Sequence, residues 1–239
     1  MPTSSTPSLS IVIPICDERD NLAPLTSQLL KALSGQGPSF EILYVDDGST
    51  DGSGPLLDQL AQDYREVRVF HFDRNYGQTA AFDAGFRQAG GQLIATLDGD
   101  LQYDARDIVT LLPLAEQYDL VCGWRKDRHD TLIKRWSSKI ANAVRVAVTQ
   151  DGVHDTGCSL KIFRRRVVER IPLFEGMHRF FPALAIMHGF TVTETPVSHF
   201  PRAHGHSKYG IGNRLFKSLR DLLAVWWMQR RGLTYRFRA

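Results

Sequence analysis

Up to residue 124, short runs of apolar and β-branched residues alternate with longer segments in which apolar residues recur at helical spacing. The short runs predict strands at Leu9–Ile15, Phe40–Val45, Val67–Phe72, Leu93–Leu97 and Leu120–Cys122. The longer segments predict helices at Asn21–Leu33, Leu56–Tyr64, Thr79–Gln88 and Asp107–Gln117. Asp51 is expected to cap the second of these helices. Strands that alternate with helices in this way are typical of βαβ units, so the pattern predicts an α/β fold with a mostly parallel sheet flanked by helices.

Beyond residue 124 this alternation fails. Residues 132–148 have apolar positions at helical spacing, and the other faces of that helix would hold Lys134, Arg135, Lys139 and Arg145. Two strand-like stretches follow, at Cys158–Phe163 and Phe190–Val197. Residues 202–212 are rich in Gly, His and basic residues, so we expect a mobile loop there.

A second amphipathic helix is expected near the end of the chain, at residues 214–231. Its apolar positions follow the helical period: Leu215, Phe216, Leu219, Leu222, Leu223, Trp226 and Trp227. The opposite face would carry Arg214, Lys217 and Arg220. This pattern is typical of a helix lying in a membrane surface, and packing on its own domain is the alternative. The expected organisation is a disordered polar tail at residues 1–8, one domain at 9–210, and this helix with a tail at 211–239.

The composition is that of a globular protein that folds without disulfides. Of its 239 residues, 43% are apolar and 23% charged, which excludes collagen-like, disordered and disulfide-scaffold classes. Cys16, Cys122 and Cys158 are far apart and lack metal-ligand spacing, so we expect a reduced, cytosolic compartment. The start of the chain does not resemble a signal peptide, and no apolar run is long enough to span a bilayer, so we expect that the chain does not cross a membrane.

The net charge of +3 conceals an uneven distribution of charged residues. Residues 1–120 hold 7 Lys and Arg against 18 Asp and Glu, a balance of −11, and the remainder holds 22 against 8, a balance of +14. This division suggests that the first half holds a cation and that the second meets phosphates or an anionic surface. A dipolar protein without functional meaning is the alternative. Arg164, Arg165 and Arg166 are expected to form a solvated face.

Polar residues cluster directly after the predicted strands, where parallel sheets bind their ligands. Asp98, Asp100 and Gln102 follow a buried strand at alternate positions, so an extended backbone would point their side chains the same way. Two carboxylates and an amide suit Mg²⁺ or Mn²⁺, which also binds substrate phosphates, so the pattern indicates a site for a diphosphate. Asp46 and Asp47 are adjacent carboxylates whose repulsion a ligand or cation would relieve.

Four segments stand out in order and spacing: Pro14–Leu22, Val45–Asp51, Arg74–Ala81 and Asp98–Gln102. Together they resemble the motifs of family 2 glycosyltransferases, whose domain is called GT-A. Further segments are similar to the dolichol-phosphate mannose synthase branch of that family: Val121–Arg125, Ser138–Asn142, Asp155–Lys161, His178–Phe180 and Arg202–Tyr209. The resemblance covers residues 8–231. It implies a GT-A fold and the transfer of a sugar from a nucleotide to a polyprenyl phosphate.

The resemblance also implies roles for individual residues. The nucleotide sugar would be bound by Pro14, Cys16, Glu18, Val45, Asp47, Asp98, Gly99, Asp100 and Lys208. The metal ion, Mg²⁺ or Mn²⁺, would be bound by Asp98, Asp100 and Gln102. The acceptor phosphate would be bound by Arg125, Lys134, Arg135 and Ser138. The catalytic group would comprise Asp98, Asp100, Arg125 and Arg202. Cys16 stands where the branch often has an aromatic residue.

The implied reaction is an inverting attack of the lipid phosphate on the anomeric carbon of the sugar. A phosphate monoester is largely dianionic near neutral pH, so this nucleophile needs no general base. The implied substrates are a nucleotide-diphosphate sugar and undecaprenyl or dolichyl phosphate. The enzyme would lie on the cytoplasmic face of a membrane, with an integral membrane protein as a further partner. No nucleic acid is expected to bind. Neutralising Arg125, Arg202 or Lys208 is expected to impair the reaction without lowering the melting temperature.

Two alternatives stay open at this point. A family 2 enzyme with a saccharide acceptor, acting in polysaccharide or lipopolysaccharide synthesis, would need a carboxylate base and would not need the basic segment at residues 134–145. The other alternative is a nucleotide-binding protein at a membrane surface that catalyses no reaction. Such a protein would not need a suitable ligand residue at every position of the metal motif. Hydrolysis of nucleotide sugars that depends on Mn²⁺ would separate an enzyme from such a scaffold.

Overall fold

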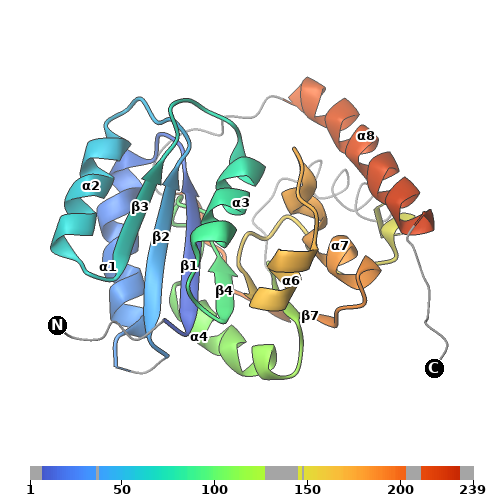
Figure 1. Cartoon of the computed structure of the whole chain (residues 1–239), viewed down its shortest axis with the longest axis horizontal. Coiled ribbons are helices and arrows are strands. Elements are labelled where there is room, and N and C mark those ends of the chain that lie inside the picture. The colour runs from blue at the N-terminus through green and yellow to red at the C-terminus, as the bar shows by residue number, and fades with distance from the viewer. Residues whose placement is uncertain (1–6, 36–37, 127–144, 147, 203–210, 232–239) are drawn as a thin grey trace, which may run out of the picture.

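The computed structural model describes residues 7–35, 38–126, 145–146, 148–202 and 211–231 (Figure 1). In these residues a seven-stranded sheet has the order β3-β2-β1-β4-β6-β5-β7. The strands are β1 (Leu9–Ile15), β2 (Phe40–Asp46), β3 (Val67–His71), β4 (Leu93–Thr96), β5 (Leu120–Trp124), β6 (Lys161–Arg164) and β7 (Val192–Pro196). The α-helices are α1 (Arg19–Leu33), α2 (Ser53–Asp63), α3 (Gln78–Gln88), α4 (Arg106–Leu111), α6 (Arg165–Arg170), α7 (Phe181–Met187) and α8 (Ile211–Arg230). Two short 3₁₀ helices are η1 (Leu112–Glu116) and η2 (Met177–Phe180).

The direction of β6 decides which loops meet at the edge of the sheet. Strand β1 is parallel to β2 and β4, β2 is parallel to β3, and β5 is parallel to β7. Strand β6 lies between β4 and β5 and is antiparallel to both, with Lys161 opposite Thr96 and Cys122. The loop that precedes Lys161 therefore reaches the same edge as the carboxyl ends of the parallel strands. Ligands bind at that edge in α/β sheets.

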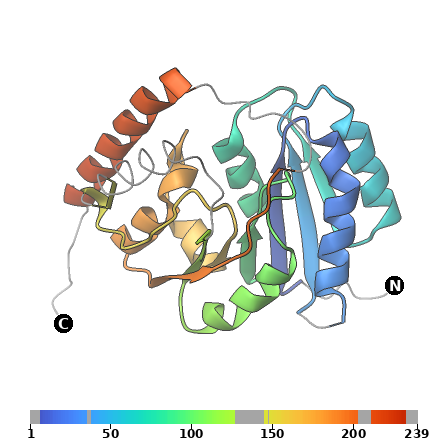
Figure 2. The same cartoon turned by 180° about the vertical axis from the view of Figure 1, so that it is seen from behind.

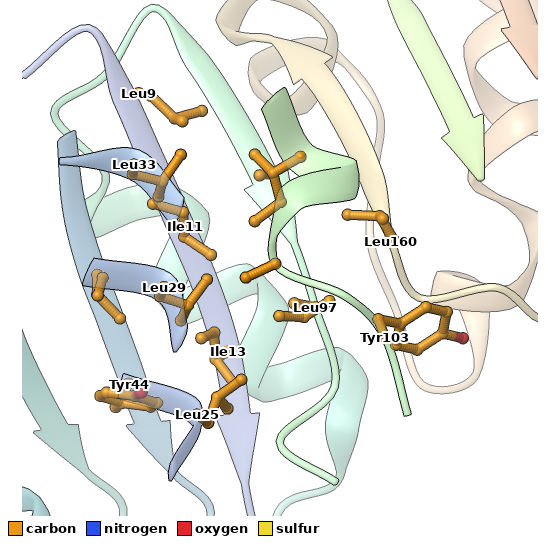
Figure 3. Packing of buried hydrophobic residues seen from close by; sticks show 14 of the residues in the cluster. Leu9, Ile11, Ile13, Leu25, Leu29, Leu33, Tyr44, Leu97, Tyr103 and Leu160 are labelled. Atoms are coloured by element: carbon orange, nitrogen blue, oxygen red, sulfur yellow. The ribbon is translucent and has the colours of Figure 1, made fainter. Parts of the chain in front are cut away.

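Helices cover both faces of the sheet, as Figures 1 and 2 show. Side chains of a strand alternate between faces, so Ile11 and Ile13 of β1 join the cluster that contains Leu25 and Leu29 of α1 (Figure 3). Val12 points to the other face and belongs to the second cluster, whose aromatic members are Phe82, Phe86, Phe163, Phe180 and Phe181. The chain thus has two cores, one on each side of the same sheet.

The prediction of an α/β fold with a mostly parallel sheet is confirmed, and every strand and helix expected before residue 124 is present. Helix α2 begins at Ser53 rather than at Leu56. The helix expected at 107–117 is divided into α4 and the 3₁₀ helix η1, which has a proline in its first turn. Helices α6 and α7 and the turn η2 were not predicted, because segments of four to seven residues are too short to display a period.

Two expected segments lie mainly outside the described residues, namely 132–148 and the loop at 202–212. Arg145 is described, and it is buried, where its guanidinium donates to Asp151 and to the carbonyl of Val153. At the start of the chain the amide of Ser8 donates to the carbonyl of Ser39 (2.8 Å), so this part of the expected tail is bonded to the domain.

The amphipathic helix expected near the end of the chain is present as α8. Some of its apolar side chains are buried in the protein and others are exposed. Leu222 and Val225 are buried in the second core, where α8 meets α7. Leu219, Leu223, Trp226 and Trp227 are exposed. Figure 1 shows α8 at the periphery, on the opposite side of the molecule from α1 and α2. Within the described ranges, no helix has the length and apolar character that crossing a bilayer requires. The division of the chain at residue 210 stays a prediction.

Candidate active site

Two carboxylates lie side by side just after β4. The side-chain amide of Gln78 donates to Asp98 Oδ1 (2.8 Å), and the backbone amide of Asp98 donates to Ser159 Oγ (3.1 Å). Burial and the neighbouring Asp100 carboxylate raise the pKa of Asp98 to about 6. Burial also raises the pKa of Asp100, although the charge of Arg202 opposes that rise. Two neighbouring carboxylates at one strand end, Asp98 half-buried and Asp100 buried, favour a cation, which would offset the repulsion between them.

The backbone around these carboxylates departs from the extended form expected from the sequence. Strand β4 ends at Thr96, and Leu101 has a φ of 58°, in the left-handed region. The prediction that one extended strand aligns Asp98, Asp100 and Gln102 is therefore wrong. The side-chain amide of Gln102 donates to the carbonyl of Phe200 (3.2 Å), so Gln102 links this loop to the segment that carries Arg202.

Gly99 separates the two carboxylates and lies against the core. A Cβ atom at this position would stand 2.4 Å from the Cδ1 atom of buried Ile15. A larger residue would require the Ile15 side chain to shift, so the absence of a side chain at residue 99 allows the loop to lie close to β1. The resemblance gave Gly99 to the nucleotide sugar; the structure gives it a role in packing.

Arg202 joins the ends of β1 and β4. Its guanidinium donates to Asp100 Oδ2 (2.9 Å) and to Glu18 Oε1 (3.2 Å). Glu18 also accepts from the side chain of Asn21 (2.5 Å), and its own amide donates to Ser53 Oγ (3.1 Å). The structure therefore brings together three residues that the sequence assigned to one site, Glu18, Asp100 and Arg202.

Arg125 follows β5 and forms a bidentate pair with Asp155. Its Nε atom is 2.7 Å from Asp155 Oδ2 and its Nη2 atom is 2.9 Å from Asp155 Oδ1. The exposed fraction of the Arg125 side chain is 13% and that of Asp155 is 8%. Although burial favours the neutral form, the Asp155 carboxylate raises the pKa of Arg125. Because neutralisation of Arg125 would leave the Asp155 carboxylate buried and unpaired, we expect it to lower the melting temperature, in contrast to the expectation from the sequence.

The loop between Asp155 and Lys161 anchors both sides of the site. Lys161 is 2% exposed, and its ammonium donates to the carbonyls of Thr156 (3.2 Å) and Cys158. The amide of Ser159 donates to the hydroxyl of Tyr103 (3.2 Å), while its own hydroxyl accepts from Asp98. The loop thus connects Arg125, through Asp155, with the carboxylates after β4.

Residues expected at the nucleotide lie at the ends of β1 and β2. Pro14 and Val45 are partners in the parallel register of these strands, and the Val45 side chain is fully buried. The Asp47 carboxylate accepts from the backbone amides of Tyr76 (2.6 Å) and Gly77 (2.9 Å). Asp47 therefore fixes the start of α3, a role that the sequence did not suggest.

Side chains of neighbouring loops support one another at this edge. The side-chain amide of Asn75 donates to the Cys16 sulfur (3.3 Å). Asp46 accepts from the amide of Ser49 (3.0 Å) and lies 2.9 Å from His71 Nδ1. Asp51 accepts from the amide of Ser53, the first residue of α2, but Gly52 and not Asp51 occupies the capping position. The carboxylates here are held mainly by backbone amides.

Some predicted site residues are outside the described part of the chain: Lys134, Arg135, Ser138 and Lys208. Among the described residues, no three His, Cys, Asp or Glu side chains gather into a metal cluster. Asp98 and Asp100 are two hard oxygen donors. Such a pair suits Mg²⁺ or Mn²⁺, which keeps positions for water and substrate phosphates.

Gln78, Asp155 and Ser159 were missed as site residues. All three lie within segments that the resemblance had singled out, but spacing alone assigned them no role. The available signal was a polar residue at the first position of a helix, for Gln78, and polar residues in the loop before a strand that begins at the site, for Asp155 and Ser159.

Solved structures share this fold. The chain superposes on glucosyl-3-phosphoglycerate synthase from Mycobacterium tuberculosis, in complex with Mn²⁺, UDP and glucosyl-3-phosphoglycerate, with a TM-score of 0.69. The match covers 96% of this chain and 81% of that one at 17% identity. At such low identity the likeness is one of fold, and it places the chain among α/β proteins of the GT-A type.

The sequence comparison then gives the family. Residues 10–172 match glycosyl transferase family 2. The chain is 40% identical over 230 residues to dodecaprenyl-phosphate galacturonate synthase of Rhizobium johnstonii, covering 93% of this chain and 67% of the relative. It is 37% identical over 218 residues to undecaprenyl-phosphate 4-deoxy-4-formamido-L-arabinose transferase of Edwardsiella ictaluri, covering 90% and 66%. The chain therefore belongs to glycosyl transferase family 2, and it spans about two thirds of the length of these relatives.

Proposed function

We propose that this glycosyltransferase moves a sugar from a nucleoside-diphosphate sugar to the phosphate of a polyprenyl lipid, with Mg²⁺ or Mn²⁺ as its cofactor. The observation that carries the proposal is the gathering of two carboxylates, half-buried Asp98 and buried Asp100, with the guanidinium of Arg202 at one edge of the sheet. The names of the two relatives support the acceptor class, because both contain a polyprenyl phosphate.

Asp98 and Asp100 would hold the divalent ion, with Gln102 as a third oxygen donor. When bound, such an ion stabilises negative charge that develops on a leaving diphosphate. Pro14, Cys16, Glu18, Val45, Asp47, Gly99 and Lys208 would surround the nucleotide sugar. Arg125, Lys134, Arg135 and Ser138 would receive the acceptor phosphate. Arginine suits this task because its planar group contacts two phosphate oxygens at once.

The proposed reaction needs no proton transfer to the enzyme. A bond forms between a lipid phosphate oxygen and the anomeric carbon, and the bond between that carbon and the donor diphosphate breaks. The electron pair of the broken bond leaves with the nucleoside diphosphate. The contribution of this chain is to place two anionic substrates together and to stabilise the leaving group with cationic side chains.

The outer face of α8 would bring the enzyme to its lipid substrate at the cytoplasmic face of the membrane. Leu223 and Trp227 are more than half exposed. The Arg230 guanidinium stands 4.3 Å from the centre of the Trp226 ring, so cation and aromatic side chain lie together, as in interfacial helices. The acidic side chain of α8, Asp221, is buried and does not oppose an anionic surface. An integral membrane protein is the further partner we propose for this face.

A panel of UDP and GDP sugars, each assayed with undecaprenyl and dolichyl phosphate, tests the transfer. Labelled product should pass into organic solvent only when donor, lipid phosphate and Mn²⁺ or Mg²⁺ are all present. Transfer to a soluble saccharide with none to the lipid would favour the alternative acceptor class. Absence of any turnover would favour a nucleotide-binding scaffold.

Flotation with liposomes tests the membrane contact. Replacing Trp226 and Trp227 together by Ala should weaken binding about tenfold or more, because burial of one large apolar side chain contributes at least about 1.5 kcal/mol. Phe174→Ala is the matched control, since Phe174 is an exposed aromatic residue outside α8. Binding that ignores both the tryptophans and the anionic lipid content would contradict this contact.

A further inference from the structure

Gln78 is the first residue of α3 and contacts the carboxylate pair directly. Its side-chain amide donates to Asp98 Oδ1 over 2.8 Å. We propose that Gln78 is a positioning residue that fixes the orientation of the Asp98 carboxylate for cation binding. This inference rests on the proposed function, in which Asp98 is a ligand of the divalent ion.

The end of the helix that carries Gln78 is held from two sides. On one side, the Asp47 carboxylate accepts from the amide of Gly77, the residue before Gln78 (2.9 Å). On the other side, the hydroxyl of Thr79, the residue after Gln78, lies 2.6 Å from His178 Nδ1 and accepts from the amide of Gly176 (3.1 Å). A side chain on a backbone fixed at both neighbours can hold its partner precisely in place.

The two carboxylates have partners of different charge. Asp100 pairs with the cation of Arg202, whereas Asp98 receives a hydrogen bond from the neutral amide of Gln78. A neutral donor orients the carboxylate but does not neutralise it, so the charge of the group stays available to a metal ion. Hydrogen-bond partners of this kind orient metal ligands, and their loss typically costs about 10–100-fold in metal affinity or activity.

The test uses Gln78→Leu in the full chain, with Mn²⁺ binding measured by the electron paramagnetic resonance signal of free Mn²⁺ in the absence of donor and acceptor. We expect the dissociation constant for Mn²⁺ to rise about tenfold or more, with no significant change in melting temperature. Gln88→Leu is the matched control, because Gln88 is the exposed last residue of the same helix. The control should bind Mn²⁺ like the wild type.

A second substitution separates positioning from mere polarity. Gln78→Asn keeps the amide but shortens the side chain by one methylene, so the hydrogen bond to Asp98 is lost. We expect its Mn²⁺ affinity to resemble that of Gln78→Leu. Wild-type affinity in Gln78→Asn would overturn the inference. This variant also serves if Gln78→Leu fails to fold.

Asp98→Asn and Asp100→Asn, measured beside these variants, separate failure of the inference from failure of the proposed function. If both lose Mn²⁺ binding while Gln78→Leu retains it, the metal site stands and the positioning role falls. If both Asp variants bind Mn²⁺ like the wild type, the metal site itself falls, and the inference falls with it. Loss in the Asp variants together with weakening in both Gln78 variants supports the inference.

Discussion

The two halves of the site use opposite charges and hold them with opposite backbone groups. In the half built on β1, β2 and β4, carboxylates accept from backbone amides, as Asp47 does from Tyr76 and Gly77. In the half built on β5 and β6, cations donate to carbonyls and carboxylates, as Lys161 does to Thr156 and Cys158. A count of charged residues in the sequence therefore does not give the charge that each half presents to a ligand, because many of these side chains are bonded within the protein.

The basic half illustrates this point. The balance of +14 over residues 121–239 suggested a surface for phosphates, but several cations of this part of the chain are engaged inside the protein. Arg145 and Lys161 are buried, and Arg164 and Arg165 donate to the carbonyls of Ala115 and Gly91. The prediction of a solvated face is thus wrong for Arg164 and Arg165. These four cations therefore bond to groups of the protein itself rather than face a phosphate ligand, and Arg164 and Arg165 do so away from the site.

The largest effect on stability is expected from Arg125→Ala, which removes one member of the buried ion pair in the basic half. It leaves Asp155 buried without its bidentate partner, and removal of one member of a buried ion pair costs about 3–5 kcal/mol. Chemical denaturation should report this loss in the free energy of unfolding. The double variant Arg125→Ala, Asp155→Ala should recover part of it. An unchanged stability in Arg125→Ala would show that the pair does not support the fold.

In the acidic half, Asp100→Ala should reduce turnover without destabilising the protein. We expect a loss of about a hundredfold, or about 2.7 kcal/mol in barrier, because the proposed metal site loses a ligand. The melting temperature should be unchanged or slightly higher, since the substitution removes the repulsion between Asp98 and Asp100. Turnover above about a tenth of the wild-type value would contradict the metal assignment.

Arg202→Ala tests the contact where the two halves meet. Its side chain is 30% exposed, but its partners Glu18 and Asp100 are only 13% and 6% exposed. Its removal leaves the Asp100 carboxylate without a cation, so we expect a lower melting temperature, by less than in Arg125→Ala and in contrast to the expectation from the sequence. We expect turnover, or the apparent affinity for the donor, to fall about tenfold, equivalent to about 1.4 kcal/mol. Steady-state kinetics with varied donor would measure both. Kinetics equal to the wild type would exclude Arg202 from the site.

The smallest effect is expected at His71, which lies between two carboxylates of the acidic half. Although burial opposes it, hydrogen bonds to Asp46 and Asp58 raise the pKa of His71. A raised pKa gives stability that is full below the unfolded value of about 6.5 and is lost as pH rises through the folded value. His71→Gln should therefore be less stable than the wild type by at most about 1 kcal/mol near pH 5.5, and by less near pH 8.5. Urea denaturation at both pH values would measure the difference.

The sequence predicted the acidic half better than the basic half for a physical reason. The strands β1 to β4 and the carboxylates after them depend on local periodicity, which one segment displays by itself. The contacts of Asp98 with Gln78 and Ser159 join residues 20 and 61 positions apart, and no local pattern encodes them. The strand at residues 158–163 was expected, but its antiparallel direction depends on its neighbours in the sheet.

The placement of β6 also has a consequence for how the chain folds. Until β6 is inserted, β4 is an exposed edge of the sheet, able to pair with other chains. Residues 97–160 must therefore be synthesised before that edge is covered and before Ser159 reaches Asp98. Closing such a long segment is entropically costly and slow, so we expect the sheet around β1 to form first and the site to be completed late. A nascent chain that stops before β6 would expose β4 and be prone to aggregate.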